Sequence, residues 1–178
     1  MFLRTLRLKD APGLPGGLEI EEAVRVATAL VAAGADALVP SGGLVPHSAF
    51  FLLRGAVPLA AMAAAEESAL QRLAVRTFGP WLVRSWPYSP SFFRDDARRM
   101  LEAVDVPVAL LGGVDSAAAV AQAMADGFGF VAMGRALLAD PDFIPRLAAG
   151  EDVVTRCTRC NECIGAMDAG GVRCTLDD

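Results

Sequence analysis

The sequence has 178 residues, 54% of them hydrophobic, and a formal net charge of −5 at pH 7. This acidic balance argues against a nucleic-acid-binding surface and against a polybasic membrane patch. No apolar run reaches the roughly 18 residues that a membrane span needs, and the charged N-terminus is unlike a signal peptide. We therefore expect neither a nucleic-acid nor a membrane partner.

The first part of the chain predicts a strand, a helix and a second strand. Residues 2–8 alternate apolar and polar side chains, which is typical of a strand. After a loop rich in Pro and Gly, apolar residues at helical spacing predict a helix over 19–33, with Gly34 as its stop. Residues 36–40 predict a second strand, which runs into Ser41-Gly42-Gly43.

The middle of the chain has a less regular pattern. We interpret residues 44–80 as a long irregular segment after the second strand, helical from about 59 to 75. Residues 81–86 could add a short strand. Ser89 followed by Pro90 is a favourable helix start, a cap and then proline at the first helical position. The side chains expected to be buried by that helix are Phe93, Ala97, Met100, Leu101 and Val104.

The last two strand–helix units are the clearest. The apolar runs 106–111 and 128–133 predict strands, the first covered on both faces. A helix capped by Ser116 and stopped by Gly127 separates them, and a helical region broken by prolines follows the second. The residues expected on the inner face of the helix between them are Ala117, Val120, Ala121 and Met124.

Strands that alternate with helices predict a parallel sheet and the α/β class. Four such units make half of an eightfold barrel, and 178 residues fall short of the roughly 250 of a complete one. We expect a half-barrel over 1–150 and a cysteine-rich segment over 151–178. Its two unpaired sheet edges should pair with a missing N-terminal half or with a second copy of the chain.

Two neighbouring strands are predicted to end at glycines, at Gly112-Gly113 and at Gly134-Arg135. Barrels often bind phosphate at the loops after their last two strands. Glycine lets backbone amides approach an anion, and an arginine can bridge phosphate oxygens. The pair therefore indicates a phosphate site; the alternative is that the glycines only form tight turns and the arginine is solvated.

The run from these strand ends, LLGGVDSAAAVAQAMADGFGFVAMGRALLADPDFIPRLAAGE, resembles the C-terminal signature of Old Yellow Enzyme and 2,4-dienoyl-CoA reductase-type proteins. The resemblance extends back through strands five and six and is weakest at 44–88. It implies strands five to eight of a (β/α)8 barrel, an FMN whose phosphate is held by Gly112, Gly113, Gly134 and Arg135, and NAD(P)H as electron donor. An ene-reductase type of oxidoreductase is the implied activity.

The same resemblance assigns a role to Arg7, which stands ten residues before Gly17. It implies that this side chain faces the pyrimidine ring of the flavin. A cation there stabilises the negative charge of the reduced cofactor. Arg4 is the rival if the strand register differs, and an ordinary charged barrel residue is the other interpretation.

All four cysteines lie in the last 22 residues, at Cys157, Cys160, Cys163 and Cys174. Such clustering indicates metal or cluster ligation in a reducing cytoplasm, not a disulfide framework. Spacers of two, two and ten residues suit a [4Fe–4S] cluster or zinc, and the compact CxxCxxC run favours iron–sulfur. Free structural thiols are the remaining alternative. Resemblance to dienoyl-CoA reductases and trimethylamine dehydrogenase-like proteins also implies a [4Fe–4S] cluster, with Asn161 on a family position.

No proton donor stands out. The lone His47 reads as a surface residue, and Tyr88 is a weaker candidate near the site. The leading hypothesis is a fragment of an FMN- and [4Fe–4S]-dependent oxidoreductase, and a non-catalytic flavin- or phosphate-binding half-barrel is the alternative. A flavin-free aldolase or isomerase is disfavoured, because the sequence offers no plausible lysine or carboxylate pair at a strand end; the only lysine, Lys9, lies just beyond Arg7.

Overall fold

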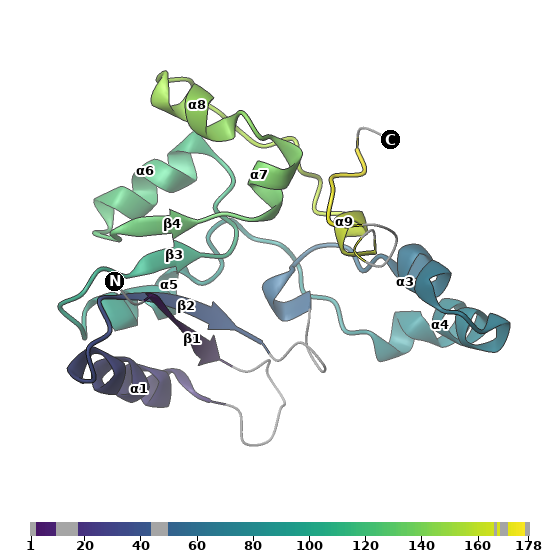
Figure 1. Cartoon of the computed structure of the whole chain (residues 1–178), viewed down its shortest axis with the longest axis horizontal. Coiled ribbons are helices and arrows are strands. Elements are labelled where there is room, and N and C mark those ends of the chain that lie inside the picture. The colour runs from purple at the N-terminus through teal and green to yellow at the C-terminus, as the bar shows by residue number, and fades with distance from the viewer. Residues whose placement is uncertain (1–2, 10–17, 44–49, 166, 168–170, 177–178) are drawn as a thin grey trace.

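The computed structural model describes most of the chain, and its arrangement is shown in Figure 1. The described residues are 3–9, 18–43, 50–165, 167 and 171–176, with 3–9 described by backbone alone. No helix among them is both long and apolar enough to cross a membrane.

Four parallel strands lie side by side in chain order. They are β1 (Leu3–Lys9), β2 (Ala37–Gly42), β3 (Ala109–Leu111) and β4 (Phe130–Ala132). β1 pairs with β2 and β3 with β4, both parallel, and a parallel bridge between Leu38 and Val108 joins the two pairs. Because the strands point the same way, their carboxyl ends meet at one edge.

The helices connect these strands and extend beyond them. They are α1 (Ile20–Ala32), α3 (Leu59–Ala65), α4 (Ala69–Leu82), α5 (Arg94–Leu101), α6 (Ala117–Ala125), α7 (Arg135–Ala139), α8 (Phe143–Ala148) and α9 (Glu162–Gly165). α1 packs against α5 beside the strands, whereas α3 and α4 form a pair at the other end of the molecule, next to α9 (Figure 1).

The core fills the space between the strands and the helices α1, α5 and α6. Its fully buried members include Leu38, Val108 and Leu110 from the strands. Phe93 and Phe51 lie with ring centroids 5.6 Å apart and carry the core toward the loops that follow β2. The core therefore ends in an aromatic floor at the strand ends.

Most predicted elements are present, but the middle of the chain differs. The strand predicted at 81–86 is wrong, because Trp81 and Leu82 form the last turn of α4. The helix predicted over 59–75 is two helices, broken between Ala65 and Ala69.

Two helix details also differ. α5 begins at Arg94 and not at Ser89, because residue Ser91 has a φ of 49°, which no α-helix can contain. The inner face predicted for α6 is wrong in part: Val120 packs against the core as predicted, but Ala121 and Met124 face solvent and Ala123 is the buried residue. The run of small residues in this helix gives little periodicity from which to choose the face.

Candidate functional site

A cavity of about 300 Å³ opens at the carboxyl ends of β3 and β4. This volume lies at the lower end of the range for small-molecule and cofactor sites. Four of the predicted cofactor residues line it: Gly112, Gly113, Gly134 and Arg135. Because β3 and β4 pair directly, with Leu111 opposite Ala132, the two glycine ends predicted from sequence lie beside each other.

The backbone conformation and close contacts explain why residues 112 and 113 are glycines. Gly112 and Gly113 have φ values of 98° and 78°, which side chains rarely adopt. A Cβ at Gly112 would lie 2.7 Å from the Phe92 ring, and one at Gly113 would lie 2.7 Å from the backbone nitrogen of Ser91. The tight-turn interpretation thus holds for these two residues, whatever else they bind.

Gly134 faces open space. A Cβ added there would meet nothing within 4 Å, and the residue precedes the first turn of α7. The backbone at Gly134 is therefore open to a bound group on this side of the cavity wall. An open approach to backbone is what a phosphate needs, so this position fits the predicted group.

Arg7 is placed only by its backbone. It lies near the end of β1 and pairs with Ser41 of β2, so it stands two strands away from β3. Gly17 and His47, which belonged to the same predictions, lie outside the described residues.

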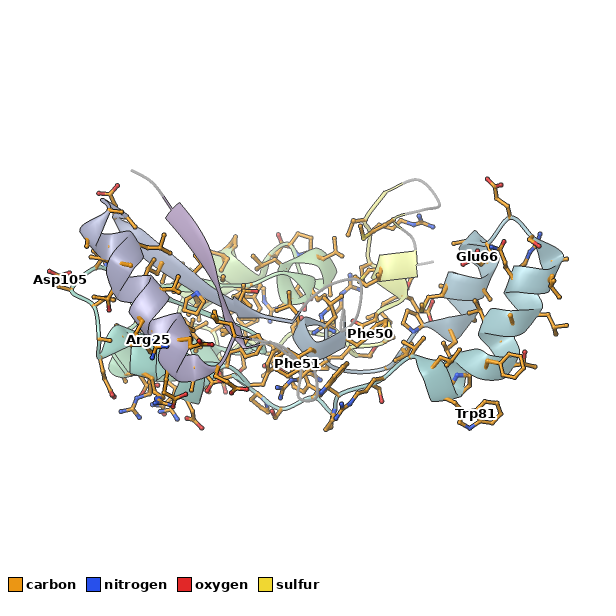
Figure 2. The ribbon with its side chains drawn as sticks, turned by 90° about the horizontal axis from the view of Figure 1, so that it is seen from below. Arg25, Phe50, Phe51, Glu66, Trp81 and Asp105 are labelled. Carbon is orange, nitrogen blue, oxygen red and sulfur yellow. The ribbon has the colours of Figure 1, made fainter. Side chains whose placement is uncertain are left out.

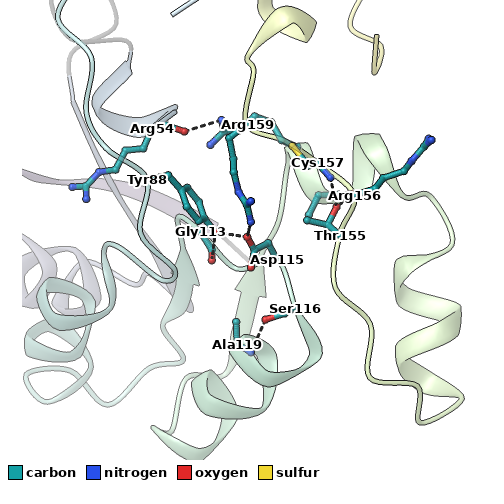
Figure 3. Close-up of polar contacts among 12 residues, drawn as sticks. Arg54, Tyr88, Gly113, Asp115, Ser116, Ala119, Thr155, Arg156, Cys157 and Arg159 are labelled. Atoms are coloured by element: carbon teal, nitrogen blue, oxygen red, sulfur yellow. Dashed lines mark hydrogen bonds and ion pairs between the residues drawn. The ribbon is translucent and has the colours of Figure 1, made fainter. Parts of the chain in front are cut away.

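A polar cluster forms one side of the cavity; the sequence singled out its Tyr88 as a candidate near the site, but not its Asp115 and Arg159. The Tyr88 hydroxyl donates to Asp115 and lies 3.1 Å from the carbonyl oxygen of Gly113. The Arg159 guanidinium donates to the same Asp115 carboxylate and lies 4.2 Å from the Tyr88 ring centroid (Figure 3). This cluster ties the turn after β3 to the cysteine segment.

Burial and this cluster control the protonation of Tyr88. Loss of water contact and the neighbouring Asp115 carboxylate raise the pKa of Tyr88 to about 12, although the Arg159 charge acts in the opposite direction. Tyr88 is therefore a neutral hydrogen-bond donor at physiological pH. Its hydrogen bond to Asp115 fixes the orientation of the ring against the cavity.

The cysteine segment reaches the cavity by crossing the start of α6. The backbone of Thr155 donates to the Asp115 carbonyl, and Ser116 bridges Val154 in an antiparallel pair. The Thr155 hydroxyl then donates to the Asp140 carboxylate at 2.7 Å. These contacts place Cys157 on the wall of the cavity.

All four cysteines line a second, much smaller pocket of about 20 Å³. Cys157, Cys160, Cys163 and Cys174 are free and partly buried. Desolvation raises the pKa of Cys163, while the charge of Arg135 opposes that shift. Within the described ranges no group of three His, Cys, Asp or Glu residues is arranged to hold a single metal ion.

Arg135 and Cys157 line both pockets. The Arg135 guanidinium donates to the backbone oxygen of Arg54 at 3.0 Å and to the side-chain oxygen of Asn161. It therefore stands between the strand-end cavity and the cysteines, with one hydrogen bond to the cysteine segment and one to the segment that follows β2.

Asn161 holds this junction together. It is 1% exposed, and its amide donates to the carbonyl oxygens of Leu53 and Ala56 while its oxygen accepts from Arg135. Its φ of 62° belongs to the left-handed region, which asparagine tolerates better than most residues. Neither this role nor that of Asp115 and Arg159 has a local sequence signal.

No protein-family model matches the chain. A curated relative, the 4,4'-dithiodibutanoate disulfide reductase of Rhodococcus erythropolis, is 32% identical over 175 residues. The alignment covers 98% of this chain and 43% of the relative, so the chain spans less than half of the relative's length. The chain is thus related to an oxidoreductase.

Proposed function

We propose that the chain is part of an FMN-dependent oxidoreductase of the Old Yellow Enzyme type, with a [4Fe–4S] cluster beside the flavin. One observation carries the proposal. The ends of β3 and β4 line one cavity, and that cavity shares Arg135 and Cys157 with the pocket lined by all four cysteines. Two redox groups bound there would be neighbours.

The cavity suits the phosphate end of the cofactor. The open backbone at Gly134 would approach the phosphate, the turn at Gly112 and Gly113 would shape the wall, and Arg135 would supply positive charge from the side of the cysteines. Arg7, at the end of β1, would face the flavin ring. When bound, the flavin supplies hydride transfer from NAD(P)H to an activated alkene or similar substrate.

We favour iron–sulfur over zinc because of the compact CxxCxxC run at Cys157, Cys160 and Cys163. All four cysteines line one small pocket, as ligands of a shared group would. Cys157, Cys160, Cys163 and Cys174 would be the four ligands.

Further strands would complete the barrel. The chain spans 43% of the disulfide reductase, and Phe130 in β4, the last of the described strands, is 46% exposed. We propose that residues 1–150 form strands five to eight of a (β/α)8 barrel and that 151–178 carry the cluster. An N-terminal half or a second copy would cover the open edges.

Two classes of substrate are candidates. The resemblance favours an activated alkene, and the name of the relative favours a disulfide. A non-catalytic flavin-binding half-barrel is the second candidate function, because the two hydroxyl groups that line the cavity already have acceptors: Tyr88 donates to Asp115 and Thr155 to Asp140.

Anaerobic purification followed by absorption spectroscopy tests the proposal. We expect flavin bands together with broad iron–sulfur absorption, and iron and acid-labile sulfide in equal amounts. Cys160→Ser should lose the iron and sulfide but keep the flavin. Bleaching of the flavin by NAD(P)H with turnover of an alkene or disulfide supports the enzyme, whereas flavin without turnover supports the non-catalytic alternative. Zinc in place of iron, or no flavin, contradicts the proposal.

A further inference from the structure

A single charged side chain lines the described part of the pocket that the four cysteines share. Besides the cysteines, the described residues around this pocket are Arg135, Leu138, Thr158, Asn161, Thr175 and Leu176. Five of these six are uncharged, so the guanidinium of Arg135 is the only side-chain charge there apart from any thiolates. A group held by the cysteines would therefore have a positive charge beside it and no carboxylate in this lining.

The charge of Arg135 is not offset by an ion pair within the described ranges. Its guanidinium donates to the backbone oxygen of Arg54 at 3.0 Å and to the side-chain oxygen of Asn161 at 2.5 Å, and both acceptors are neutral. No carboxylate of the described residues forms an ion pair with it. The positive charge at the pocket therefore acts on its surroundings without a neighbouring negative group.

The two arginines of the cysteine segment, Arg156 and Arg159, differ from Arg135 in this respect. Arg156 lies 3.4 Å from a carboxylate oxygen of Asp140, and Arg159 forms an ion pair with Asp115. Opposite charges held close together nearly cancel at a distance, so each pair contributes little field beyond its immediate neighbours. Neither arginine is among the residues that line the cysteine pocket. Of these three arginines, Arg135 is therefore the one whose full charge acts on the pocket.

The two acceptors of Arg135 hold the guanidinium in place. One is the buried side chain of Asn161, and the other is the carbonyl of Arg54, shortly after the buried Phe50 and Phe51. Figure 2 shows these two phenylalanines in the middle of the molecule, between the strands and the α3–α4 pair. Both acceptors thus belong to segments fixed by burial. A charge held in this way needs little reorganisation when a nearby group gains an electron.

The thiol of Cys163 responds to this charge. Burial raises the pKa of Cys163, and the charge of Arg135 opposes that rise because it favours the thiolate. No other cation contributes to the shift among the causes found for this thiol. Arg135 therefore stabilises negative charge at the cysteines.

We propose that Arg135 sets the reduction potential of the cluster, an inference that rests on the proposed function. One-electron reduction adds one negative charge to a [4Fe–4S] group with its four thiolates, and the electron comes from the reduced flavin. A fixed positive charge beside the sulfurs stabilises the reduced form more than the oxidised form, which raises the potential. Arg135 thereby favours the transfer of electrons from the flavin to the cluster.

A redox titration of the anaerobically purified chain in excess FMN, followed by the electron paramagnetic resonance of the reduced cluster, tests the proposal. Arg135→Gln should lower the equilibrium constant for cluster reduction about tenfold, a fall of about 59 mV in the potential. Arg135→Lys keeps the charge and should keep the potential of the unaltered chain. Thr158→Lys, which adds a positive charge at an exposed position of the same pocket, should raise the potential.

Arg146→Gln is the control, because it removes an exposed arginine of α8 that does not line the pocket, and it should leave the potential unchanged. Iron and acid-labile sulfide are measured in every variant. An unchanged potential in Arg135→Gln, an equal fall in Arg135→Lys or Arg146→Gln, or no rise in Thr158→Lys would overturn the inference. So would loss of the iron from both Arg135 variants, because Arg135 would then act by shaping the pocket. An unaltered chain without iron would contradict the proposed function, and the inference with it.

Discussion

Arg135 donates a hydrogen bond to the side-chain oxygen of Asn161, joining the residue after β4 to the middle of the cysteine motif. Asn161 also holds the carbonyl oxygens of Leu53 and Ala56, so one buried amide connects three segments that are far apart in sequence. The strand-end cavity and the cysteine pocket are built around this junction.

Asn161→Gly should destabilise the chain by about 2 kcal/mol, because buried groups on three partners lose their hydrogen bonds while glycine keeps the left-handed backbone. Chemical denaturation followed by circular dichroism measures the change. Gln122→Ala, which removes an exposed side-chain hydrogen bond to Asp126, is the control and should cost less than about 0.5 kcal/mol. Equal effects of the two changes would show that the junction contributes nothing to stability.

Gly55→Ala should be strongly destabilising, by about 3 kcal/mol. Its φ is 134°, and the new Cβ would lie 2.4 Å from the carbonyl oxygen of Arg159. That oxygen accepts from the backbone nitrogen of Ala56, so the clash would separate the two loops. Thermal unfolding measures the effect.

Gly150→Ala is the matched control, since Gly150 also has a positive φ, 84°, but a Cβ there would meet nothing within 4 Å. It should carry only the backbone cost, about 1 kcal/mol. A loss at Gly55 no larger than that at Gly150 would contradict the close contact with the cysteine segment.

Tyr88 should titrate near pH 12, well above its ordinary value of 10. It is the only tyrosine, so phenolate absorbance reports it without overlap from another tyrosine. Because the folded pKa is raised, the stability due to neutral Tyr88 is complete below pH 10 and is lost as the pH rises toward 12. Circular dichroism must show that the chain remains folded over the titration.

The two neighbours of Tyr88 should move its titration in opposite directions. Asp115→Asn removes a hydrogen bond and a negative charge that favour the neutral phenol, so the pKa should fall. Arg159→Gln removes a positive charge that favours the phenolate, so the pKa should rise. Asp126→Asn, which alters a carboxylate paired with Arg94 elsewhere, should leave the midpoint unchanged. Shifts of the same sign at Asp115 and Arg159 would contradict the cluster.

The features that could be predicted from the sequence are those that depend on a local pattern of residues. A strand within 106–111 and the turn at Gly112-Gly113 follow from an apolar run and its glycines; the strand is shorter than predicted, Ala109–Leu111, and the turn lines the cavity. The convergence with Gly134 follows from parallel pairing of consecutive units. The grouping of the cysteines followed from their spacing.

What the sequence could not predict depends on contacts across long separations. Asp115 and Arg159 are 44 residues apart, and Tyr88 reaches them from a segment without regular structure. The left-handed backbone at Ser91, Arg159 and Asn161 has no strong residue signal, since only asparagine favours it. The sequence predicts a helix that ends near residue 75 and a strand over 81–86, so it divides the single helix α4 between two separate elements.

The comparison of FMN with riboflavin as ligands tests the central claim most directly. If the cavity between Gly112 and Gly134 holds the phosphate, FMN should bind about 100-fold more tightly than riboflavin, which lacks that group. Gly134→Val, which fills the open approach, should remove the preference, while Ala118→Val on the exposed side of α6 should retain it. Equal affinity for both flavins, or an undiminished preference in Gly134→Val, would contradict the account.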